Sequence, residues 1–126
     1  MRFNFFKIFI LMVLLSTAFL SVHANEASDF ERQTGLASYY SDKLQGRSTA
    51  SGQPYDKDKL SAAHLSLPFG TLLRVTNLAN GKHVIIPVND RGPYRDKRII
   101  DVSRKAAEAL DMISAGIIKV SIEIQK

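Results

Sequence analysis

The segment "VIIPVNDRGPYRDKRIIDVS", residues 84–103, places a charged loop between two apolar stretches. A turn needs only Gly92 and Pro93, because glycine tolerates positive φ and proline fixes its own φ. The acid and base that precede them, Asp90 and Arg91, exceed that requirement. Loops at strand ends commonly hold binding and catalytic residues, so we expect a functional site here. The alternative is that Asp90 only organises the turn through an Asx hydrogen bond.

Short strands are expected to position this loop. The patterns predict strands at "LASYY", "TLLRVTN" and "HVIIPV", the last two forming a hairpin with Asn80-Gly81 at its turn. Pro87 should lie at an edge or a crossover, where its missing N–H is not needed. The segment "IIKVSIEIQ" alternates apolar and polar residues, which predicts a strand with one buried face and one solvent-exposed face.

Two short helices are expected between the strands. One spans residues 56–67, with Asp56 or Asp58 as N-cap, and the other spans residues 103–112, with Ser103 as N-cap. About six short strands with two small helices favour a small closed barrel, since closure removes exposed sheet edges.

The N-terminal residues 1–24 have the pattern of a signal peptide. Two basic residues precede the apolar run "IFILMVLLSTAFL", and "VHA" before Asn25 offers small residues at the cleavage positions. The alternative, an uncleaved membrane anchor, is disfavoured because the apolar run is shorter than the roughly 20 residues that a bilayer needs. We expect residues 25–34 to be a flexible leader and residues 35–126 to be one domain.

Composition narrows the function classes. The net charge is +5, and removing the two basic residues of the signal peptide leaves +3, too little and too interleaved with acids to predict a nucleic-acid binder. An anionic polymer of the cell envelope is the natural partner. Without cysteine the chain forms no disulfide and carries no lipid on an N-terminal Cys. His64 and His83 lack the carboxylate spacing of a metal site, so we expect no metal and no cofactor.

Five motifs occur in one order: "GRSTASG", "SAAH", "LPFGTLLRVTNLANG", "VNDRGPY" and "RIIDVS". Over residues 35–124 the chain resembles the rare lipoprotein A family of exported peptidoglycan enzymes, whose barrel is also seen in expansins. The resemblance implies a mainly β fold, a six-stranded double-psi β-barrel with two short helices. It also implies lytic transglycosylase chemistry, in which the primary hydroxyl of N-acetylmuramic acid attacks and leaves a 1,6-anhydro end.

In this resemblance Asp90 matches the acidic position, where one carboxyl group protonates the leaving oxygen and then accepts the proton of the hydroxyl. His64 matches a family histidine; it is either a partner that sets the protonation of Asp90 or a helix-end histidine bonded to the backbone. The implied substrate-binding residues are Gln53, Thr49, Asn89, Arg91, Tyr94 and Asp101. For Asp101, helix capping and fold support are equally open. Tyr39 and Tyr40 either stack on sugar or fill the barrel rim.

The chain departs from the family at Gln53, where a glutamate is usual. Glutamine neither transfers a proton at neutral pH nor stabilises a positive oxocarbenium as a carboxylate does. Three hypotheses stay open: a transglycosylase that uses Asp90 alone, a non-catalytic glycan-binding barrel of the expansin type, and an interaction protein that no longer binds sugar. We expect a monomer in the periplasm or cell envelope that is not lipidated and whose partner is peptidoglycan glycan.

Overall fold

A computed structural model of the chain describes Phe30 and residues 32–126. The predicted signal peptide, residues 1–24, lies outside the described residues, as does most of the predicted leader. Within the described part of the chain, no helix is both long enough and apolar enough to cross a membrane. The first strand begins at Gln33, two positions before the predicted domain boundary.

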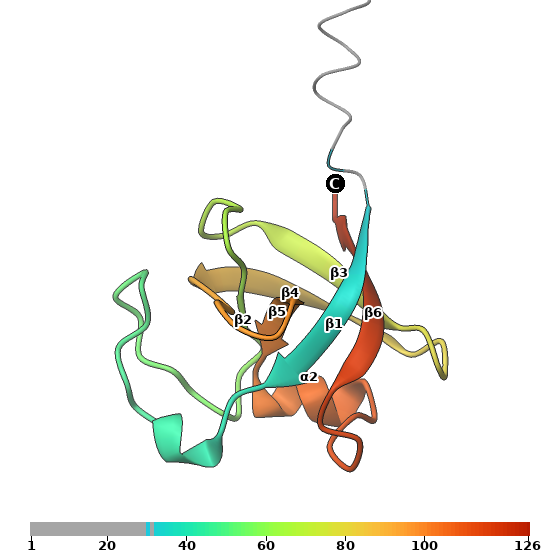
Figure 1. Cartoon of the computed structure of the whole chain (residues 1–126). Helices are drawn as coiled ribbons and strands as arrows, with labels where there is room; N and C mark the ends of the chain where they lie inside the picture. Colours follow the sequence, from blue (N-terminus) through green and yellow to red (C-terminus); the bar gives the residue numbers. More distant parts are fainter. Residues whose placement is uncertain (1–29, 31) are drawn as a thin grey trace, which may run out of the picture. The chain divides into compact units, whose positions relative to one another are not determined.

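The described residues form a closed barrel of six strands (Figure 1). The strands are β1 (Gln33–Tyr39), β2 (Ala62–Ala63), β3 (Leu72–Asn77), β4 (His83–Asp90), β5 (Arg98–Val102) and β6 (Ile118–Ile124). Their order around the barrel is β1-β5-β2-β4-β3-β6. Two pairs are parallel, β1 with β5 and β2 with β4, and the other pairs are antiparallel. The prediction of a mainly β, six-stranded barrel is confirmed.

The β3–β4 hairpin is also confirmed. The two strands pair antiparallel, and Gly81, with a φ of 76°, donates its N–H to the Asn77 carbonyl at 2.8 Å. Pro87 pairs with Leu72 of β3, whereas β2 begins to pair with β4 only at Val88. At Pro87, β4 is therefore paired on one side only, so the proline leaves no strand without a hydrogen-bond donor. This agrees with the expected place of Pro87 at an edge.

One of the two predicted helices is present. Helix α2 (Arg104–Ala109) begins after the predicted N-cap Ser103, whose Oγ accepts a hydrogen bond from the Ala106 N–H at 3.3 Å. Figure 1 shows α2 lying across one end of the barrel. Leu110 and Met112, which follow α2 in the chain, have buried side chains.

The predicted helix at residues 56–67 is wrong. Asp56 does accept a local hydrogen bond, from the Asp58 N–H at 2.9 Å, but this closes a turn. The following residues Ala62 and Ala63 form β2, which is buried and pairs with both β4 and β5. Pairing with two strands therefore overrides the local signal for a helix. The second short helical element is a 3-10 turn, η1 (Asp42–Leu44).

The barrel interior is filled by apolar side chains with no exposed surface: Ala37, Leu73, Val75, Ile86, Val88, Ile100, Val102, Val120 and Ile122. Burial alternates along β3 as the strand period requires. In β6 the predicted alternation holds for the inner face, but the polar Ser121 is only 1% exposed. Ser121 pairs with Thr34 of β1 and Thr76 of β3, so the prediction that Ser121 is solvent-exposed is wrong.

Candidate active site

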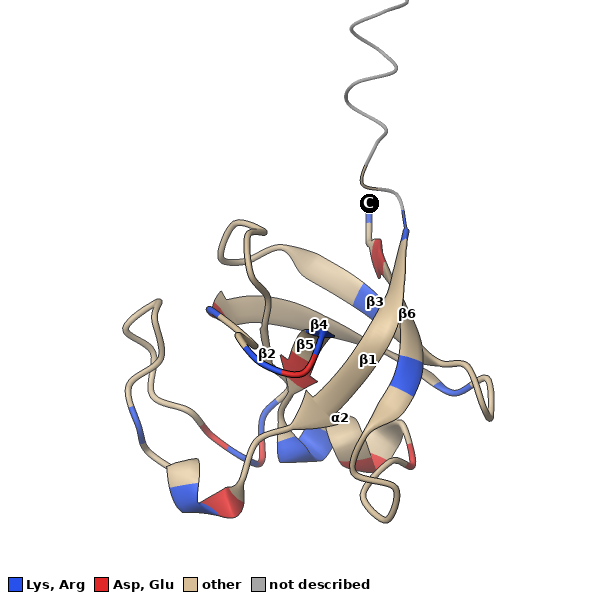
Figure 2. Cartoon of the chain, in the orientation of Figure 1, with Lys and Arg blue, Asp and Glu red and all other residues tan. Residues whose placement is uncertain are grey.

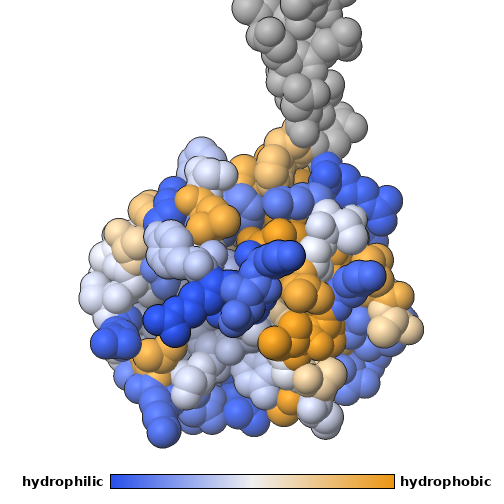
Figure 3. All heavy atoms as spheres, viewed as in Figure 1, coloured by the Kyte–Doolittle hydropathy of each residue, from blue (hydrophilic) through white to orange (hydrophobic). Residues whose placement is uncertain are grey.

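A groove of about 350 Å³ lies where β1, β2 and β4 end. Its lining includes Tyr40, Ala63, Asp90, Tyr94, Arg98 and Asp101. The loop after β4 contributes one wall, and Figure 2 shows its charged residues in alternation across the front of the barrel. Figure 3 shows a hydrophilic band across the same face, bordered on one side by an apolar patch. The predicted charged loop therefore does form the wall of a groove.

Asp90 is the last residue of β4, and its carboxylate is held from three directions. Oδ1 accepts the backbone N–H of Ala50 at 2.9 Å and that of Arg91 at 2.9 Å. Oδ2 accepts the hydroxyl of Tyr40. The Asp90 backbone pairs with Ala63, and its carbonyl accepts the His64 N–H at 3.2 Å. The carboxylate of Asp90 thus orders the loop and also lines the groove, and its predicted catalytic role stays a prediction.

Tyr40 is a partner of Asp90 that the sequence did not indicate, since the two residues are 50 positions apart. It directly follows β1, and its N–H continues the ladder to the Val102 carbonyl at 3.0 Å. Its ring stacks on Tyr55, with centroids 4.4 Å apart and planes at 16°. Burial raises the pKa of Tyr40, and the hydrogen bond to Asp90 raises it further, so the hydroxyl keeps its proton.

His64 lies directly after β2 and is 3% exposed. Its Nδ1 accepts the N–H groups of Ser66 at 3.1 Å and Leu67 at 3.2 Å, so the hydrogen-bond network assigns the proton to Nε2, 3.3 Å from Oε1 of Gln33. Burial lowers the pKa of His64, and the charge of Arg91 adds to this. The imidazole is therefore neutral and bonded to its own loop, while the His64 N–H connects it to the Asp90 backbone.

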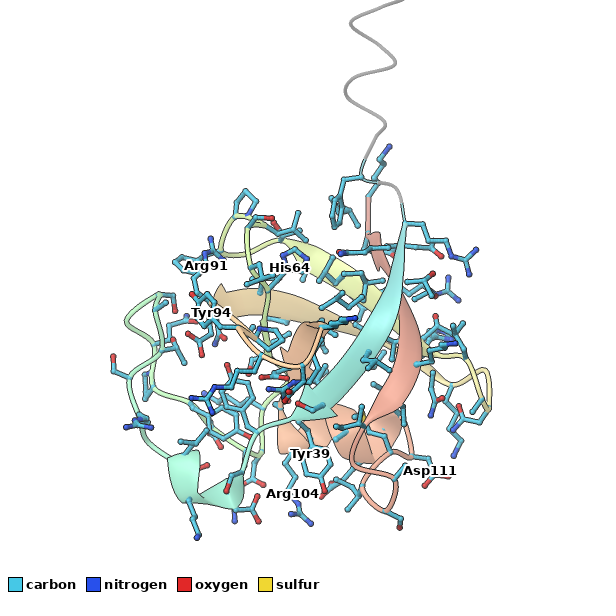
Figure 4. The ribbon with its side chains drawn as sticks, viewed as in Figure 1. Tyr39, His64, Arg91, Tyr94, Arg104 and Asp111 are labelled. Atoms are coloured by element: carbon cyan, nitrogen blue, oxygen red, sulfur yellow. The ribbon has the colours of Figure 1, made fainter. Side chains whose placement is uncertain are left out.

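Arg91 folds back onto the barrel. Its guanidinium lies 4.1 Å from the centroid of the Phe69 ring, and Nη1 donates to the carbonyls of His64 at 3.3 Å and Asp90 at 3.4 Å. Arg91 thereby fixes the start of the loop. Tyr94, from the same loop, is 77% exposed and lines the groove (Figure 4).

Asp101 of β5 lies in the same groove. Its Oδ1 accepts the Ser38 hydroxyl and Nη1 of Arg98, the latter at 3.0 Å. Arg98 also donates to the Ser38 hydroxyl oxygen. The cap of α2 is Ser103, so the alternative in which Asp101 caps this helix is wrong. Asp101 instead joins β5 to β1 at the floor of the groove.

Thr49 and Gln53 belong to the loop whose Ala50 N–H bonds to Asp90, and Asn89 precedes Asp90 in β4. Thr49 is buried and donates its hydroxyl to the Gln53 carbonyl at 2.6 Å, which shapes the loop. Oε1 of Gln53 accepts Nδ2 of Asn89 at 3.4 Å. Gln53 and Asn89 line a second hollow of about 350 Å³ together with Pro54, Lys59, Leu60 and Pro87. Because adjacent side chains of a strand point to opposite faces, Asn89 and Asp90 serve different hollows.

The predicted site residues therefore separate into three groups. The groove is lined by Asp90, Arg91, Tyr94 and Asp101, and the second hollow is lined by Gln53 and Asn89. The other two residues, Thr49 and His64, are buried, and their side chains form hydrogen bonds with backbone groups. Among the residues that the structure describes, no three His, Cys, Asp or Glu side chains cluster as metal ligands would.

A closed six-stranded barrel with this strand order and two parallel pairs is a double-psi β-barrel, here with a carboxylate at the mouth of a groove. Residues 32–122 match the family described as lytic transglycolase, and the chain belongs to that family.

Two relatives and one solved structure illustrate the similarity. The probable endolytic peptidoglycan transglycosylase RlpA of Treponema pallidum is 57% identical over 88 residues, covering 70% of this chain and 28% of the relative. The endolytic peptidoglycan transglycosylase RlpA of Haemophilus influenzae is 50% identical over 99 residues, covering 79% of this chain and 34% of the relative. This chain thus spans about a third of the length of these relatives.

The solved structure is a point variant of Clavibacter michiganensis expansin in complex with cellohexaose. It superimposes with a TM-score of 0.59 at 28% identity, covering 75% of this chain and 50% of the expansin.

Proposed function

We propose that this domain cleaves peptidoglycan glycan strands as a lytic transglycosylase, with Asp90 as general acid and then general base. The observation that carries the proposal is the asymmetric hold on Asp90 at the groove: Oδ1 accepts two backbone N–H groups, which leaves Oδ2 for proton transfer. The names of the relatives, endolytic peptidoglycan transglycosylases, support the same activity.

The reaction needs one proton donor that becomes a proton acceptor. Oδ2 of protonated Asp90 gives its proton to the glycosidic oxygen as the bond from that oxygen to the anomeric carbon breaks. The primary hydroxyl of the same N-acetylmuramic acid then attacks the anomeric carbon, and its proton passes to Oδ2. The products are a free sugar end and a 1,6-anhydro end, without water, and Asp90 returns to its starting state.

The other predicted site residues would act on the substrate or on the loops. Tyr94 would stack on a sugar ring at the groove, and Gln53 with Asn89 would offer amide groups to a sugar in the second hollow. Thr49 and His64 would act by holding the loops on either side of Asp90.

A second candidate function is glycan binding without cleavage, which we call the function of a glycan-gripping barrel. Gln53 favours this candidate, because the amide cannot replace a carboxylate at that position in proton transfer or charge stabilisation. The similarity to an expansin whose structure holds cellohexaose supports glycan binding of this kind.

We further propose that the domain is exported, that residues 1–24 are removed as a signal peptide, and that the product works as an unlipidated monomer in the periplasm or cell envelope. The absence of cysteine from the sequence supports the unlipidated form.

The deciding experiment is digestion of peptide-free glycan strands with residues 25–126, followed by mass spectrometry of the products. We expect 1,6-anhydro ends from the parent domain and none from Asp90→Asn. Asparagine keeps an acceptor for the two N–H groups but loses the charge that strengthens three hydrogen bonds, so the free energy of unfolding should fall by about 1 to 3 kcal/mol, and urea unfolding checks that the variant is folded. Product at the parent level from Asp90→Asn would reject the mechanism.

Binding to purified sacculi separates the remaining hypotheses. Binding without anhydro products would identify the glycan-gripping barrel. A folded domain that neither binds sacculi nor cuts glycan would be an interaction protein.

A further inference from the structure

The hydroxyl of Tyr40 contacts the one carboxylate oxygen that the reaction requires. We propose that Tyr40 is a positioning residue of this site, whose hydroxyl holds the transferable proton of Asp90 on Oδ2 and sets the pH at which Asp90 releases it. This inference rests on the proposed function for its biological meaning, but its physical content concerns Tyr40 and Asp90 alone.

The first step of the argument is the difference between the two oxygens of Asp90. Oδ1 accepts two backbone N–H groups, from Ala50 and Arg91, each at 2.9 Å. An oxygen that already accepts two N–H groups has no free lone pair for a proton. The proton of the acid form therefore resides on Oδ2, which is the oxygen that Tyr40 contacts.

The second step is that a phenol hydroxyl serves both forms of the acid. When Asp90 is ionised, the Tyr40 hydroxyl donates to Oδ2, and when Asp90 is protonated, the phenol oxygen can accept from it. Because burial raises the pKa of Tyr40, the phenol stays protonated throughout and does not compete as a base. Donation to the ionised form favours that form, so removing the hydroxyl should favour the protonated acid.

The third step is that the hydroxyl is held in place from several elements. The ring stacks on Tyr55, whose own hydroxyl accepts the N–H of Arg104 at the start of α2 at 3.1 Å. The Tyr55 backbone bonds to Arg47 at 2.7 Å and to Gly46 at 2.8 Å. Helix α2, strand β1 and the loop over Asp90 thus fix the phenol together.

The charged groups around the phenol come from three elements. Asp90 belongs to β4, and Asp101 of β5 also raises the pKa of Tyr40 through its charge. Arg98 of β5 balances Asp101 at 3.0 Å, and Arg91 of the loop is turned onto the Phe69 ring. The hydrogen bond to Asp90 is therefore the strongest polar influence on the phenol.

The test compares Tyr40→Phe with a matched control, Tyr39→Phe. The two tyrosines are adjacent, and each variant loses one hydroxyl with one hydrogen bond, but the Tyr39 hydroxyl donates to the Ile113 carbonyl at 2.9 Å instead of to Asp90. The measurement is an NMR titration of the Asp90 side-chain carboxyl in residues 25–126.

We expect Tyr40→Phe to move the titration midpoint upward by about 1 pH unit, the difference between a hydrogen bond to the ionised acid and a weaker one to the protonated acid. Tyr39→Phe should leave the midpoint at the parent value. An unchanged midpoint in folded Tyr40→Phe, or an equal shift in both variants, would overturn the inference.

Two further measurements keep the inference separate from folding and from activity. If Tyr40→Phe does not fold, the hydroxyl proton of Tyr40 is followed in the parent: we expect a resonance far downfield that moves upfield in Asp90→Asn, and an unmoved resonance would overturn the inference. If the parent makes no anhydro product, the carboxyl titration still decides the role of Tyr40, while the proposed function fails. In an active parent, Tyr40→Phe should displace the pH–rate profile upward with the carboxyl midpoint.

Discussion

The pair formed by Asp101 and Arg98 permits a decisive test of whether Asp101 supports the fold or acts on substrate. The Asp101 carboxylate lies 3.0 Å from Arg98, with side chains 22% and 20% exposed. The perturbation is a double-mutant cycle of Asp101→Asn and Arg98→Met. Asparagine keeps an acceptor for Ser38, so the cycle isolates the charged interaction.

The expected magnitude follows from partial burial. Exposed ion pairs contribute about 0 to 1 kcal/mol, and hydrogen bonds to charged groups contribute about 1.5 to 3 kcal/mol. Because solvent reaches about a fifth of each side chain, we expect a coupling free energy of about 1 to 2 kcal/mol. Urea unfolding at pH 7 measures it, and 1 M salt should reduce it in part.

The control cycle uses Asp42→Asn and Arg104→Met. This pair has the same separation, 3.0 Å, but its side chains are 49% and 36% exposed, so we expect a clearly smaller coupling than for Asp101 and Arg98. Equal couplings in the two cycles would refute the reasoning from burial. Lost anhydro product from a variant Asp101→Asn of parental stability would instead assign Asp101 to the substrate.

The remaining predictions concern His64 and Gln53. Since burial lowers the pKa of His64, the unfolded chain binds a proton below about pH 6.5 that the folded chain does not, so stability falls as pH falls through that range. His64→Asn, which keeps an acceptor for the two N–H groups, should flatten this dependence, and a curve parallel to the parent would contradict it. Gln53→Glu should raise product formation about tenfold or more, with an unchanged pH optimum, provided that the bound glycan extends from the groove of Asp90 into the second hollow and its oxocarbenium reaches the new carboxylate; a folded variant without gain would favour the glycan-gripping barrel.

The elements that could be predicted from the sequence are those whose signals are local. Ser103 at the start of α2, the Asn80-Gly81 turn and the apolar positions of β6 each depend on neighbours in the chain. Residues 62 and 63 become a strand only because β4 and β5 lie on both sides of them. A pattern of neighbouring residues contains no information about such partners, and the helix prediction failed there.

The site was predictable to a similar degree. The excess charge of the loop after β4 indicated Asp90, because the signal lies in adjacent residues. The contact of Tyr40 with Asp90 depends on the barrel bringing the ends of β1 and β4 together, and no spacing in the sequence encodes it. Strand alternation predicts that the side chains of Asn89 and Asp90 point to opposite faces. Which hollow each side chain lines depends on where the loop with Ala50 and Gln53 lies, and the sequence does not give that position.

The position of Gln53 in the structure bears on the effect of having glutamine where the family usually has glutamate. Gln53 bonds to Asn89 in the second hollow, whereas Ala50, from the same loop, bonds to Asp90 in the groove. A carboxylate at position 53 would therefore act on bound sugar more than on the protonation of Asp90. The groove already contains a second carboxylate, Asp101, whose charge is balanced by Arg98 at 3.0 Å. The direct hydrogen bonds of the Asp90 carboxylate come from Tyr40, Ala50 and Arg91, and none of them involves the side chain at position 53.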